Sequence, residues 1–532
     1  MVSPSVPVPT GQIRPLAVAM ASFAAFGGFL YGYDTGYISG VKEMDSWRRI
    51  FGDSAPDANG VPQLSSGRDS LVTSILSAGT FFGALGAYPV GDTLGRRFGI
   101  CAYLILFCIG VACQTGAKNI ATFVVGRVFA GLGVGGTSCL VPMYQAECAP
   151  KSIRGAIVSG YQWMITIGLL IAAVVVKGTK DRSTAAAYQI PIGLQFIWAF
   201  ILATGLLILP ESPRWLLLKD KEEKARKALA RILSQDPDSQ EVNEELAEIA
   251  ANLHHERSIG QTSWLACFSN GEGKNGLRAW TGIGLQALQQ LSGINFIFYY
   301  GTTFFRRSGI KDPFIITIAT NVVNVGATIP GILAVDRVGR RSLLLYGAAA
   351  MCVCHFIVAG TGVGVSADNK AGQQVLIAFV CIFIAHFAAT WGPFAWVVTS
   401  EIYPLSIRGK CMSMSTASNW LWNFGIGYAT PYLVDSKPGS AGLGSNVFWI
   451  WGGACVLCFI FTFFFIYETK GLALEQVDIL YRNSNALHSN KFRKQILDEN
   501  LHDEDKEAYY TGAQKNTNEK AEHKEDADMR DL

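Results

Sequence analysis

The sequence predicts an all-α membrane protein: twelve transmembrane helices in two pseudo-symmetric six-helix bundles, joined by a polar helical linker. Three observations predict this fold, namely the composition, the number of long apolar runs and an internal repeat. Of the 532 residues, 50% are apolar and 16% are charged, whereas soluble domains contain about 25% charged residues. Much of the surface of such a chain must therefore face lipid.

The apolar runs are long enough to cross a bilayer as helices. At 1.5 Å per residue, about 20 apolar residues span a hydrocarbon core of ~30 Å. Twelve runs meet this requirement, at approximately residues 15–39, 69–91, 98–116, 120–142, 155–177, 190–209, 279–303, 313–335, 342–362, 373–399, 411–432 and 446–467. The first run lacks a cleavage-site pattern, so we expect a retained anchor and not a removed signal peptide.

The remaining segments are polar and divide the chain. We expect a short cytoplasmic segment at 1–14, the two bundles at 15–209 and 279–467, and a cytoplasmic linker at 210–278. The linker contains "KEEKARKALARIL" and "EVNEELAEIAANL", in which apolar residues recur at helical spacing. The tail, 468–532, is dense in charge, and we predict that it is cytoplasmic and largely disordered from about residue 484.

The distribution of basic residues predicts the orientation. The short loops alone favour one orientation, but the lysines and arginines near the two ends of the linker reverse the balance. Because basic residues concentrate on the cytoplasmic side, both termini are predicted there. The net charge of +3 is too small to indicate a nucleic-acid partner.

Three motifs of the first half recur in the same order in the second half. "GDTLGRR" (91–97) recurs as "VDRVGRR" (335–341), "AECAPKSIRG" (146–155) as "SEIYPLSIRG" (400–409), and "PESPRWL" (210–216) more loosely as "YETKGLA" (467–473). Such repeats predict two homologous halves. Secondary transporters commonly have this layout and bind their substrate near the midplane, between the halves.

Several uncharged amides lie deep within the apolar runs. Gln289 and Gln290, in "LQQLSGINFIFYY" (288–300), lie ~15 Å into the seventh run, Asn324 ~17 Å into the eighth and Asn419 ~12 Å into the eleventh at helical rise. Amides donate and accept hydrogen bonds without net charge, which suits a neutral polyhydroxylated ligand. The alternative is that they only join helices. Their similar depth favours a shared binding site.

Two sets of charged residues also lie within or beside the runs. Asp34 and Arg127 lie ~7 Å and ~10 Å below the same membrane surface, and intramembrane ionisable residues are candidates for function. A permanent structural ion pair is the alternative. At the other surface, Glu147 and Arg154 recur as Glu401 and Arg408. We expect these groups to pair between the halves as a gate; anchoring of the loops is the alternative.

The repeated Gly-Arg-Arg loops, "PESPRWL", "QQLSGINFIFYY", "ETKGLALEQVD" and "TWGPFAWV" (390–397) together resemble the sugar porters of the major facilitator superfamily, over roughly residues 15–480. Fungal hexose transporters are the most similar group. Two residues depart from the family pattern: Thr93 stands where the first loop usually has arginine, and Tyr467 where the last motif usually has proline. Both positions are on the cytoplasmic side and bear on the gate, not on the substrate class.

The resemblance implies a hexose transporter of the plasma membrane, with glucose the default substrate, that works by alternating access with a proton as co-substrate. Facilitated diffusion and a transporter-like glucose sensor are the alternatives. The implied sugar contacts are Gln162, Gln289, Gln290, Asn295, Asn324, Trp396 and Asn419. The implied proton-coupling pair is Asp34 and Arg127. The implied cytoplasmic gate consists of Arg97, Glu147, Arg154, Glu211, Arg340, Glu401, Arg408 and Glu468.

No enzyme activity, cofactor or metal is expected. Cys352 and Cys354, and Cys455 and Cys458, lie in apolar runs without polar neighbours and are interpreted as small hydrophobic residues. The expected partners are a monosaccharide, the proton and membrane lipid, and the protein is expected to be monomeric.

Overall fold

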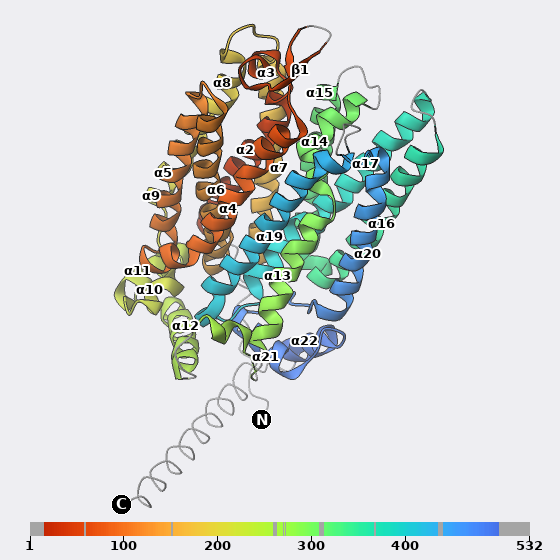
Figure 1. Ribbon diagram of the computed structural model, residues 1–532. Helices are drawn as coiled ribbons and strands as arrows, with labels where there is room; N and C mark the ends of the chain where they lie inside the picture. The colour runs from red at the N-terminus through yellow and green to blue at the C-terminus, as the bar shows by residue number, and fades with distance from the viewer. Residues whose placement is uncertain are drawn as a thin grey trace, which may run out of the picture.

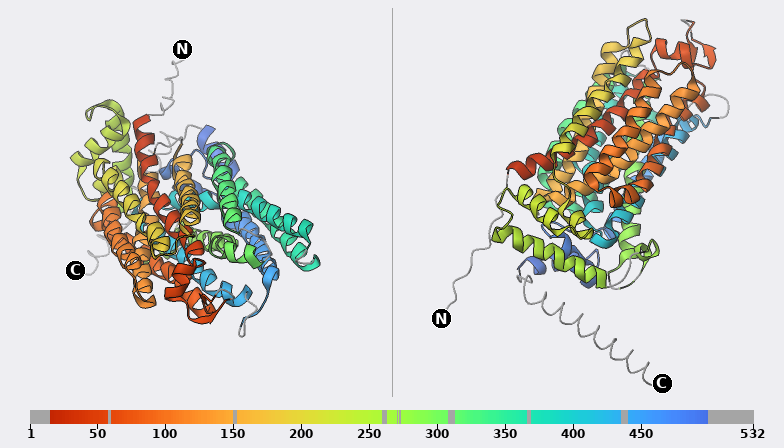
Figure 2. Two further views of the ribbon diagram at one scale, coloured as in Figure 1. Left: turned by 90° about the horizontal axis from the view of Figure 1, so that it is seen from above. Right: turned by 90° about the vertical axis from the view of Figure 1, so that its left-hand side faces the viewer.

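The computed structural model describes residues 15–57, 60–149, 153–258, 263–269, 271, 273–307, 313–365, 369–434 and 440–498. The predicted segment 1–14 and the last part of the predicted tail, 499–532, lie outside these described residues. The protein is almost entirely helical, and its helices form two bundles side by side (Figures 1 and 2).

The first bundle contains the six predicted spans of the N-terminal half. Its helices are α1 (Pro15–Ala24), α2 (Phe26–Val41), α4 (Ser66–Thr93), α5 (Arg96–Thr115), α6 (Ile120–Cys148), α7 (Arg154–Thr179), α8 (Ala186–Gly193) and α9 (Gln195–Ile208). Side-chain caps start two of them: Ser65 accepts a hydrogen bond from the Arg68 N–H before α4, and Asn119 from the Thr122 N–H before α6. Such caps satisfy N–H groups that a helix start leaves without partners.

The second bundle contains the other six spans. Its helices are α13 (Asn275–Leu291), α14 (Ile294–Arg307), α15 (Pro313–Val338), α16 (Arg340–Gly364), α17 (Lys370–Ala389), α18 (Trp391–Glu401), α19 (Leu405–Val434), η3 (Gly444–Asn446) and α20 (Val447–Phe465). Within the described residues, nine helical segments are each long and apolar enough to cross a membrane. The pairs α1–α2 and α13–α14, together with α19, supply the remaining spans. The predicted twelve-helix fold is confirmed.

The polar elements lie at the two ends of the bundles (Figure 1). At the top are α3 (Asp45–Phe51) and a two-stranded antiparallel sheet of β1 (Ser54–Pro56) and β2 (Pro62–Gln63), which the sequence analysis did not predict. At the bottom are α10 (Pro213–Leu218), α11 (Glu222–Leu233), α12 (Gln240–Ser258), η2 (Leu265–Phe268), α21 (Leu474–Asn483) and α22 (Ser489–Asp498). We call the bottom the linker end and the top the opposite end.

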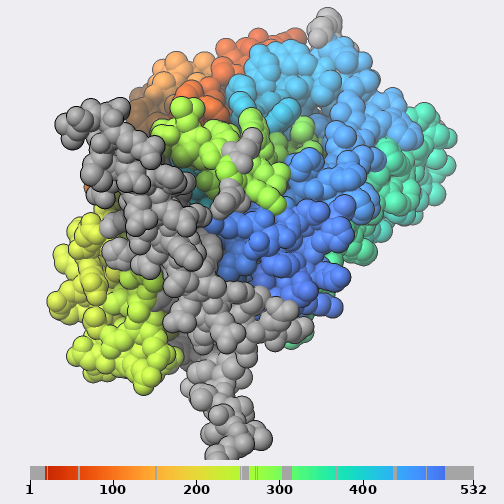
Figure 3. Space-filling model, turned by 90° about the horizontal axis from the view of Figure 1, so that it is seen from below, coloured from red at the N-terminus to blue at the C-terminus, as the bar shows by residue number. Residues whose placement is uncertain are grey.

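The tail is ordered further than predicted. Helices α21 and α22 pack beneath the second bundle, and Figure 3 shows them beside the start of α13 at the linker end. Tyr481 and Ser489 are buried, as is Ile496 on α22. The prediction of disorder from residue 484 is therefore wrong as far as residue 498, because a few buried side chains, among them Tyr481 and Ile496, are enough to dock two short amphipathic helices.

Two spans of the second bundle are broken near their middle. Between α13 and α14, Gly293 has φ of +87°, a conformation that glycine adopts without steric cost. Between α17 and α18, Thr390 has φ of −134° and ψ of −86°. Gly392 and Pro393 follow this break directly. Proline cannot donate to the preceding turn, so the helix restarts there.

Glycines set the close packing of α4 against α6. "FAGLGVGG" (129–136) lies in α6, and a Cβ atom on Gly135 would lie 2.1 Å from the carbonyl oxygen of Thr80. Gly131 and Gly83 meet backbone atoms of the facing helix in the same way. These close approaches identify the stretch as a helix-packing motif.

This packing predicts opposite effects for two glycine substitutions. We expect Gly135→Ala to destabilise the purified protein by about 1–3 kcal/mol, because the added methyl group overpacks a backbone contact. Gly160→Ala, on α7, is the control, since nothing lies within 4 Å of its added Cβ. Alanine in an open helical position gains up to about 1 kcal/mol over glycine. Thermal unfolding in detergent measures both, and equal effects would contradict the packing argument.

Candidate functional site

A cavity lies between the two bundles, at the level of the breaks in the helices. The first bundle contributes Tyr31, Thr35, Gln162, Ile165 and Leu169, and the second contributes Gln289, Gln290, Ile294, Asn295, Phe298, Phe387 and Trp396. Five of the seven predicted sugar contacts, Gln162, Gln289, Gln290, Asn295 and Trp396, thus line one cavity. Every polar side chain in this lining is uncharged.

The amides of α13 and α19 form a continuous hydrogen-bonded network beside the cavity. Gln290 donates to Asn419 Oδ1 at 2.9 Å and accepts from Asn423 at 3.2 Å and from Asn295. Asn419 donates to Gln289 Oε1 at 2.7 Å and to Gln286 Oε1 at 2.6 Å. Asn419 therefore positions the lining amides from behind and is not itself part of the lining.

Gln289 also stabilises the break between α17 and α18. Its Nε2 donates to the carbonyl oxygens of Trp391 at 3.1 Å and Gly392 at 2.8 Å. A break in a helix exposes such carbonyls, and unpaired buried acceptors cost free energy. Gln289 thus has both of the roles considered for the buried amides: it joins helices and it lines the cavity.

Asn324 and Trp396 differ in their relation to this cavity. Trp396, on α18, lies edge-on to Tyr161 of α7, with ring centroids 5.4 Å apart, so the aromatic wall crosses from one bundle to the other. Asn324, on α15, is fully buried but lies outside the lining. Neither atom of its amide has a hydrogen-bond partner among the described residues. Its role as a sugar contact stays a prediction.

Asp34 and Arg127 lie together in the first bundle, as predicted. Both side chains are fully buried, and Arg127 Nη1 lies 3.8 Å from Asp34 Oδ2. The same nitrogen donates to the Tyr37 hydroxyl at 3.1 Å, and that hydroxyl donates to Gln114 at 2.6 Å. The ion pair is thus longer than a hydrogen bond, and Arg127 has a second, neutral partner. Thr35, next to Asp34, lines the cavity.

At the linker end, each half contains the same cluster around its Gly-Arg-Arg loop. In the first half, Arg96 donates to both carboxylate oxygens of Glu147, at 3.0 and 2.9 Å. The Glu211 carboxylate accepts from the backbone N–H groups of Arg96 and Arg97 at 3.0 and 3.1 Å. Burial raises the pKa of Glu211 above its ordinary value, although these N–H groups and the Arg96 charge oppose that change. Ser212 donates to Glu147 at 2.5 Å.

The second half contains the equivalent cluster, with the same kinds of hydrogen bond. Arg340 donates to both oxygens of Glu401, at 3.2 and 2.8 Å. Glu468 accepts from the N–H groups of Arg340 and Arg341 at 2.9 and 3.1 Å, and Thr469 donates to Glu401 at 2.7 Å. Gly95 and Gly339 have φ of +91° and +111°, and a Cβ on either would lie 2.4 Å from the glutamate that follows its bundle.

This symmetry adds one residue to the predicted gate cluster. Arg97, which was assigned to the gate, donates its backbone N–H to Glu211 and its guanidinium to the carbonyl of Leu209. Arg96 binds Glu147 and is the counterpart of Arg340, which the sequence analysis did name. The sequence repeat already indicates that Arg96 is the counterpart of Arg340, since the two arginines align in the two loops.

The two gate glutamates pair within their own halves in this state. Glu147 and Glu401 were expected to pair across the halves with Arg408 and Arg154. The Arg408 guanidinium donates to the Tyr403 carbonyl, 3.1 Å away in the same half. The Arg408 charge also acts on Glu147 across the halves, and Asp336 makes a direct contact between the halves by accepting from the Ala156 N–H at 2.9 Å. Pairing of these glutamates across the halves stays a prediction.

The cavity is closed at both ends. Towards the opposite end, Ser77 donates to Asn423 at 2.6 Å and Ser70 to the Tyr428 carbonyl at 2.9 Å, so α4 binds α19. Lys42 lies 4.6 Å from the ring centre of Tyr300. Towards the linker end, Asp336 binds α7. The space left for the centres of water molecules is ≈ 30 Å³, which is room for about two waters.

Comparison with known proteins agrees with this architecture. Residues 20–481 match the family described as "Sugar (and other) transporter". The chain is a sugar porter of the major facilitator superfamily. Major facilitator-type transporter ecdD of Aspergillus rugulosus is 50% identical to it over 474 residues, which are 87% of either chain. The probable glucose transporter rco-3 of Neurospora crassa is 46% identical over 482 residues, 90% of this chain and 81% of that protein.

Two further relatives bear on mechanism. The high glucose sensor RGT2 of Saccharomyces cerevisiae is 42% identical over 485 residues, 90% of this chain but 63% of that protein. Among solved structures, the proton:xylose symporter XylE bound to 6-bromo-6-deoxy-D-glucose matches with a TM-score of 0.76 and 27% identity, over 88% of this chain and 99% of that chain. The inward-open conformation of XylE from E. coli matches with a lower TM-score of 0.66 and 27% identity, over 87% of this chain and 99% of that chain.

The structure adds residues to the site of this sugar porter that the sequence analysis missed. Gln286 and Asn423 belong to the amide network, and Tyr31, Thr35 and Phe298 line the cavity. Gln286 and Asn423 could have been found, because they lie one helical turn from Gln290 and Asn419 and so share a face with them. The aromatic lining residues gave no such signal in an apolar sequence.

The paired clusters predict different effects for two adjacent arginines. We expect Arg96→Leu to destabilise this sugar porter by about 3–5 kcal/mol, because it leaves the Glu147 charge buried without its partner. Arg97→Leu is the matched control, since the Arg97 side chain donates to a backbone carbonyl and lies over the Phe98 ring. For this variant we expect a loss of about 1 kcal/mol. Thermal unfolding in detergent compares them. A larger loss for Arg97→Leu would contradict the assignment of the buried charge pair to Arg96.

Proposed function

We propose that this sugar porter is a hexose transporter of the plasma membrane, with glucose as its default substrate, and that it works by alternating access. The observation that carries the proposal is the shared cavity: Gln162 from one bundle faces Gln289, Gln290, Asn295 and Trp396 from the other. Neutral amides can replace the water around sugar hydroxyls, and aromatic faces suit the apolar C–H patches of the ring.

The closed state supports alternating access. A cavity with room for about two waters must open before a hexose can enter. Because the clusters around Arg96 and Arg340 lie within single halves, each half can move as a body. Only the contacts between halves need to break, such as Asp336 with Ala156 at the linker end or Ser77 with Asn423 towards the opposite end. We place the linker end in the cytoplasm, as the basic residues of the linker favour.

We further propose that transport is coupled to a proton through Asp34. Its long contact with Arg127, and the second partner of Arg127 in Tyr37, allow Asp34 to take a proton without leaving the arginine unpartnered. A charge moving through ~150 mV supplies ~3.5 kcal/mol, and one pH unit adds ~1.4 kcal/mol. Together these support a sugar gradient of the order of a thousandfold.

Facilitated diffusion and glucose sensing remain the alternatives. The similarity to the sensor RGT2 favours the second of these, although that protein is considerably longer. Uptake of radiolabelled glucose by cells without hexose transporters of their own distinguishes a transporter of either kind from a sensor. A transporter restores uptake, whereas a sensor reaches the membrane and leaves uptake at background.

The amide network predicts which substitutions weaken uptake. In these cells, we expect Gln290→Ala to raise the KM for glucose about tenfold or more, because Gln290 lines the cavity and a lost hydrogen bond in a well-packed site costs about 1.5 kcal/mol. Asn324→Ala is the matched control and should change the KM less than threefold, since Asn324 lies outside the lining. Surface expression of each variant is measured alongside. If Asn324→Ala has the larger effect, the sugar binds elsewhere along the seam between the bundles.

Proton coupling predicts a distinct result for Asp34→Asn. In the wild type, glucose accumulates above its external concentration and a protonophore abolishes the accumulation. Asp34→Asn resembles the protonated side chain, so we expect it to lose accumulation while it still exchanges labelled for unlabelled glucose across the membrane. Equal accumulation by both proteins, insensitive to the protonophore, would contradict coupling and leave facilitated diffusion.

A further inference from the structure

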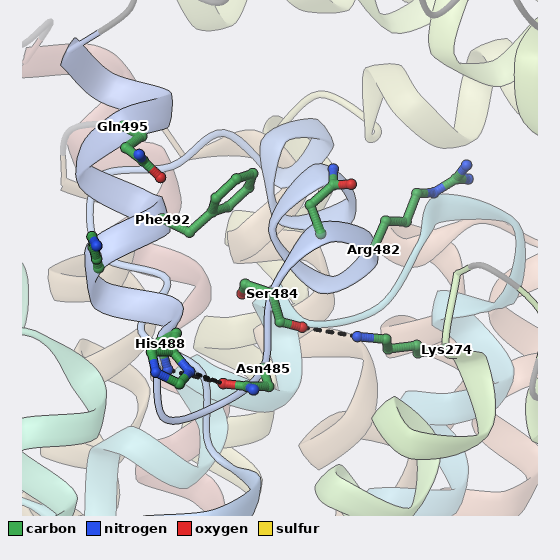
Figure 4. A pocket seen from close by; sticks show the side chains of 9 residues that line it. Lys274, Arg482, Ser484, Asn485, His488, Phe492 and Gln495 are labelled. Atoms are coloured by element: carbon green, nitrogen blue, oxygen red, sulfur yellow. Dashed lines mark hydrogen bonds between the residues drawn. The ribbon is translucent and has the colours of Figure 1, made fainter.

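A second pocket lies at the linker end, between the tail and the start of α13. Its lining residues are Lys274, Arg482, Asn483, Ser484, Asn485, His488, Lys491, Phe492 and Gln495, and its volume is ≈ 530 Å³. Figure 4 shows the turn between α21 and α22 on one side and Lys274 on the other. The sugar cavity is separate, since it shares no lining residue with this pocket.

The charge in this pocket is entirely positive. Among its lining residues, Lys274, Arg482 and Lys491 are cations, His488 can become one, and the other polar groups are neutral amides and a serine. Asp478, a nearby acid on α21, is already bound by Arg278. No lining residue is a carboxylate, so the formal charge of the lining favours an anion.

Lys274 lies on the α13 side of the pocket and already has one hydrogen-bond partner in the tail. It has a left-handed backbone with φ of +49°, and its Nζ donates to the Ser484 carbonyl at 2.8 Å, as the dashed line in Figure 4 shows. Burial and the neighbouring Arg278 charge lower the pKa of Lys274. An ammonium group donates up to three hydrogen bonds, so Lys274 can bind both Ser484 and an anion.

We propose that this pocket binds a phosphate group, carried either by a soluble phosphate ester or by a lipid head group. Phosphate offers several oxygens and close to two negative charges, which suit the lysine, arginine and amide N–H donors around the pocket better than a single carboxylate does. The volume leaves room for a small polar group attached to the phosphate. This binding does not depend on the proposed sugar transport.

The pocket is connected to the linker-end cluster of the second half. Tyr467 donates through its hydroxyl to the same Ser484 carbonyl at 3.3 Å, and its ring stacks on Tyr481 with centroids 4.0 Å apart. The next residue, Glu468, binds the Gly-Arg-Arg loop through the Arg340 N–H. A phosphate that bridges α13 and α22 would therefore hold the tail against this cluster and stabilise the docked state.

The test uses the full chain purified in detergent. Inorganic phosphate and glucose 6-phosphate are titrated, with uncharged glucose as the control ligand, and binding is followed by calorimetry and by the rise in unfolding temperature that a bound ligand produces. A second arm reconstitutes the protein in phosphatidylcholine nanodiscs with and without phosphatidylinositol 4-phosphate. Lys491→Glu is the test variant. Lys494→Glu has the same charge change on the same helix but lies outside the pocket.

We expect Lys491→Glu to weaken phosphate binding about tenfold or more, as the loss of a charged hydrogen bond implies, and Lys494→Glu to leave it nearly unchanged. If Lys491→Glu does not fold, Lys491→Gln keeps the test with a smaller expected loss. Selective weakening with the soluble probes supports an ester ligand, and selective weakening only in the lipid arm supports a head group. Equal weakening by both variants, or no binding of any phosphate, would overturn the proposal.

Discussion

The structure depends on one arrangement that occurs twice, an arginine bound by a buried glutamate beneath each six-helix bundle. Arg96 with Glu147 and Arg340 with Glu401 both make two parallel hydrogen bonds, a geometry that fits guanidinium to carboxylate. Taking such charges from water is costly, and losing one partner leaves the other unpaired. Each pair therefore fastens the helices of its own half, and any movement must take place at the surface between the halves.

That surface is polar at mid-depth but almost free of charge. The amides of Gln289, Gln290 and Asn419 bind one another, so a sugar that binds at the proposed site must exchange these hydrogen bonds for its own. The net gain is the difference between two similar sets of bonds, which is small. On this proposal we expect moderate affinity, which a carrier needs because a tightly bound substrate would not be released.

The sequence was sufficient for the spans, the repeat and the depth of each polar residue, but not for the direction of every side chain. Periodicity and length identify a membrane helix, and rise per residue places Gln290, Asn324 and Asn419 at similar depths. Which of them reaches the cavity depends on how each helix is rotated about its own axis, and packing in the folded bundle sets that rotation. Asn419 consequently lies behind the lining and Asn324 outside it. The tail was mispredicted for a related reason, since its composition is polar while its docking depends on contacts such as Tyr467 with Tyr481.

The two copies of the arginine cluster are held by different neighbours, and this difference gives the protein its asymmetry. In the first half, the aspartate of the repeated loop, Asp92, binds Lys219 of the linker at 2.9 Å, and its carbonyl accepts from Trp215. In the second half, the equivalent Asp336 binds the backbone of α7 in the other bundle. The linker thus occupies in one half the position that a contact between the halves occupies in the other. Separation of the bundles at the linker end must break the bond of Asp336 but can leave that of Asp92 intact, so α10, at the start of the linker, should travel with the first bundle. The docked tail should travel with the second bundle, as should the end of the linker, where the Gly276 N–H donates to the Ser269 carbonyl.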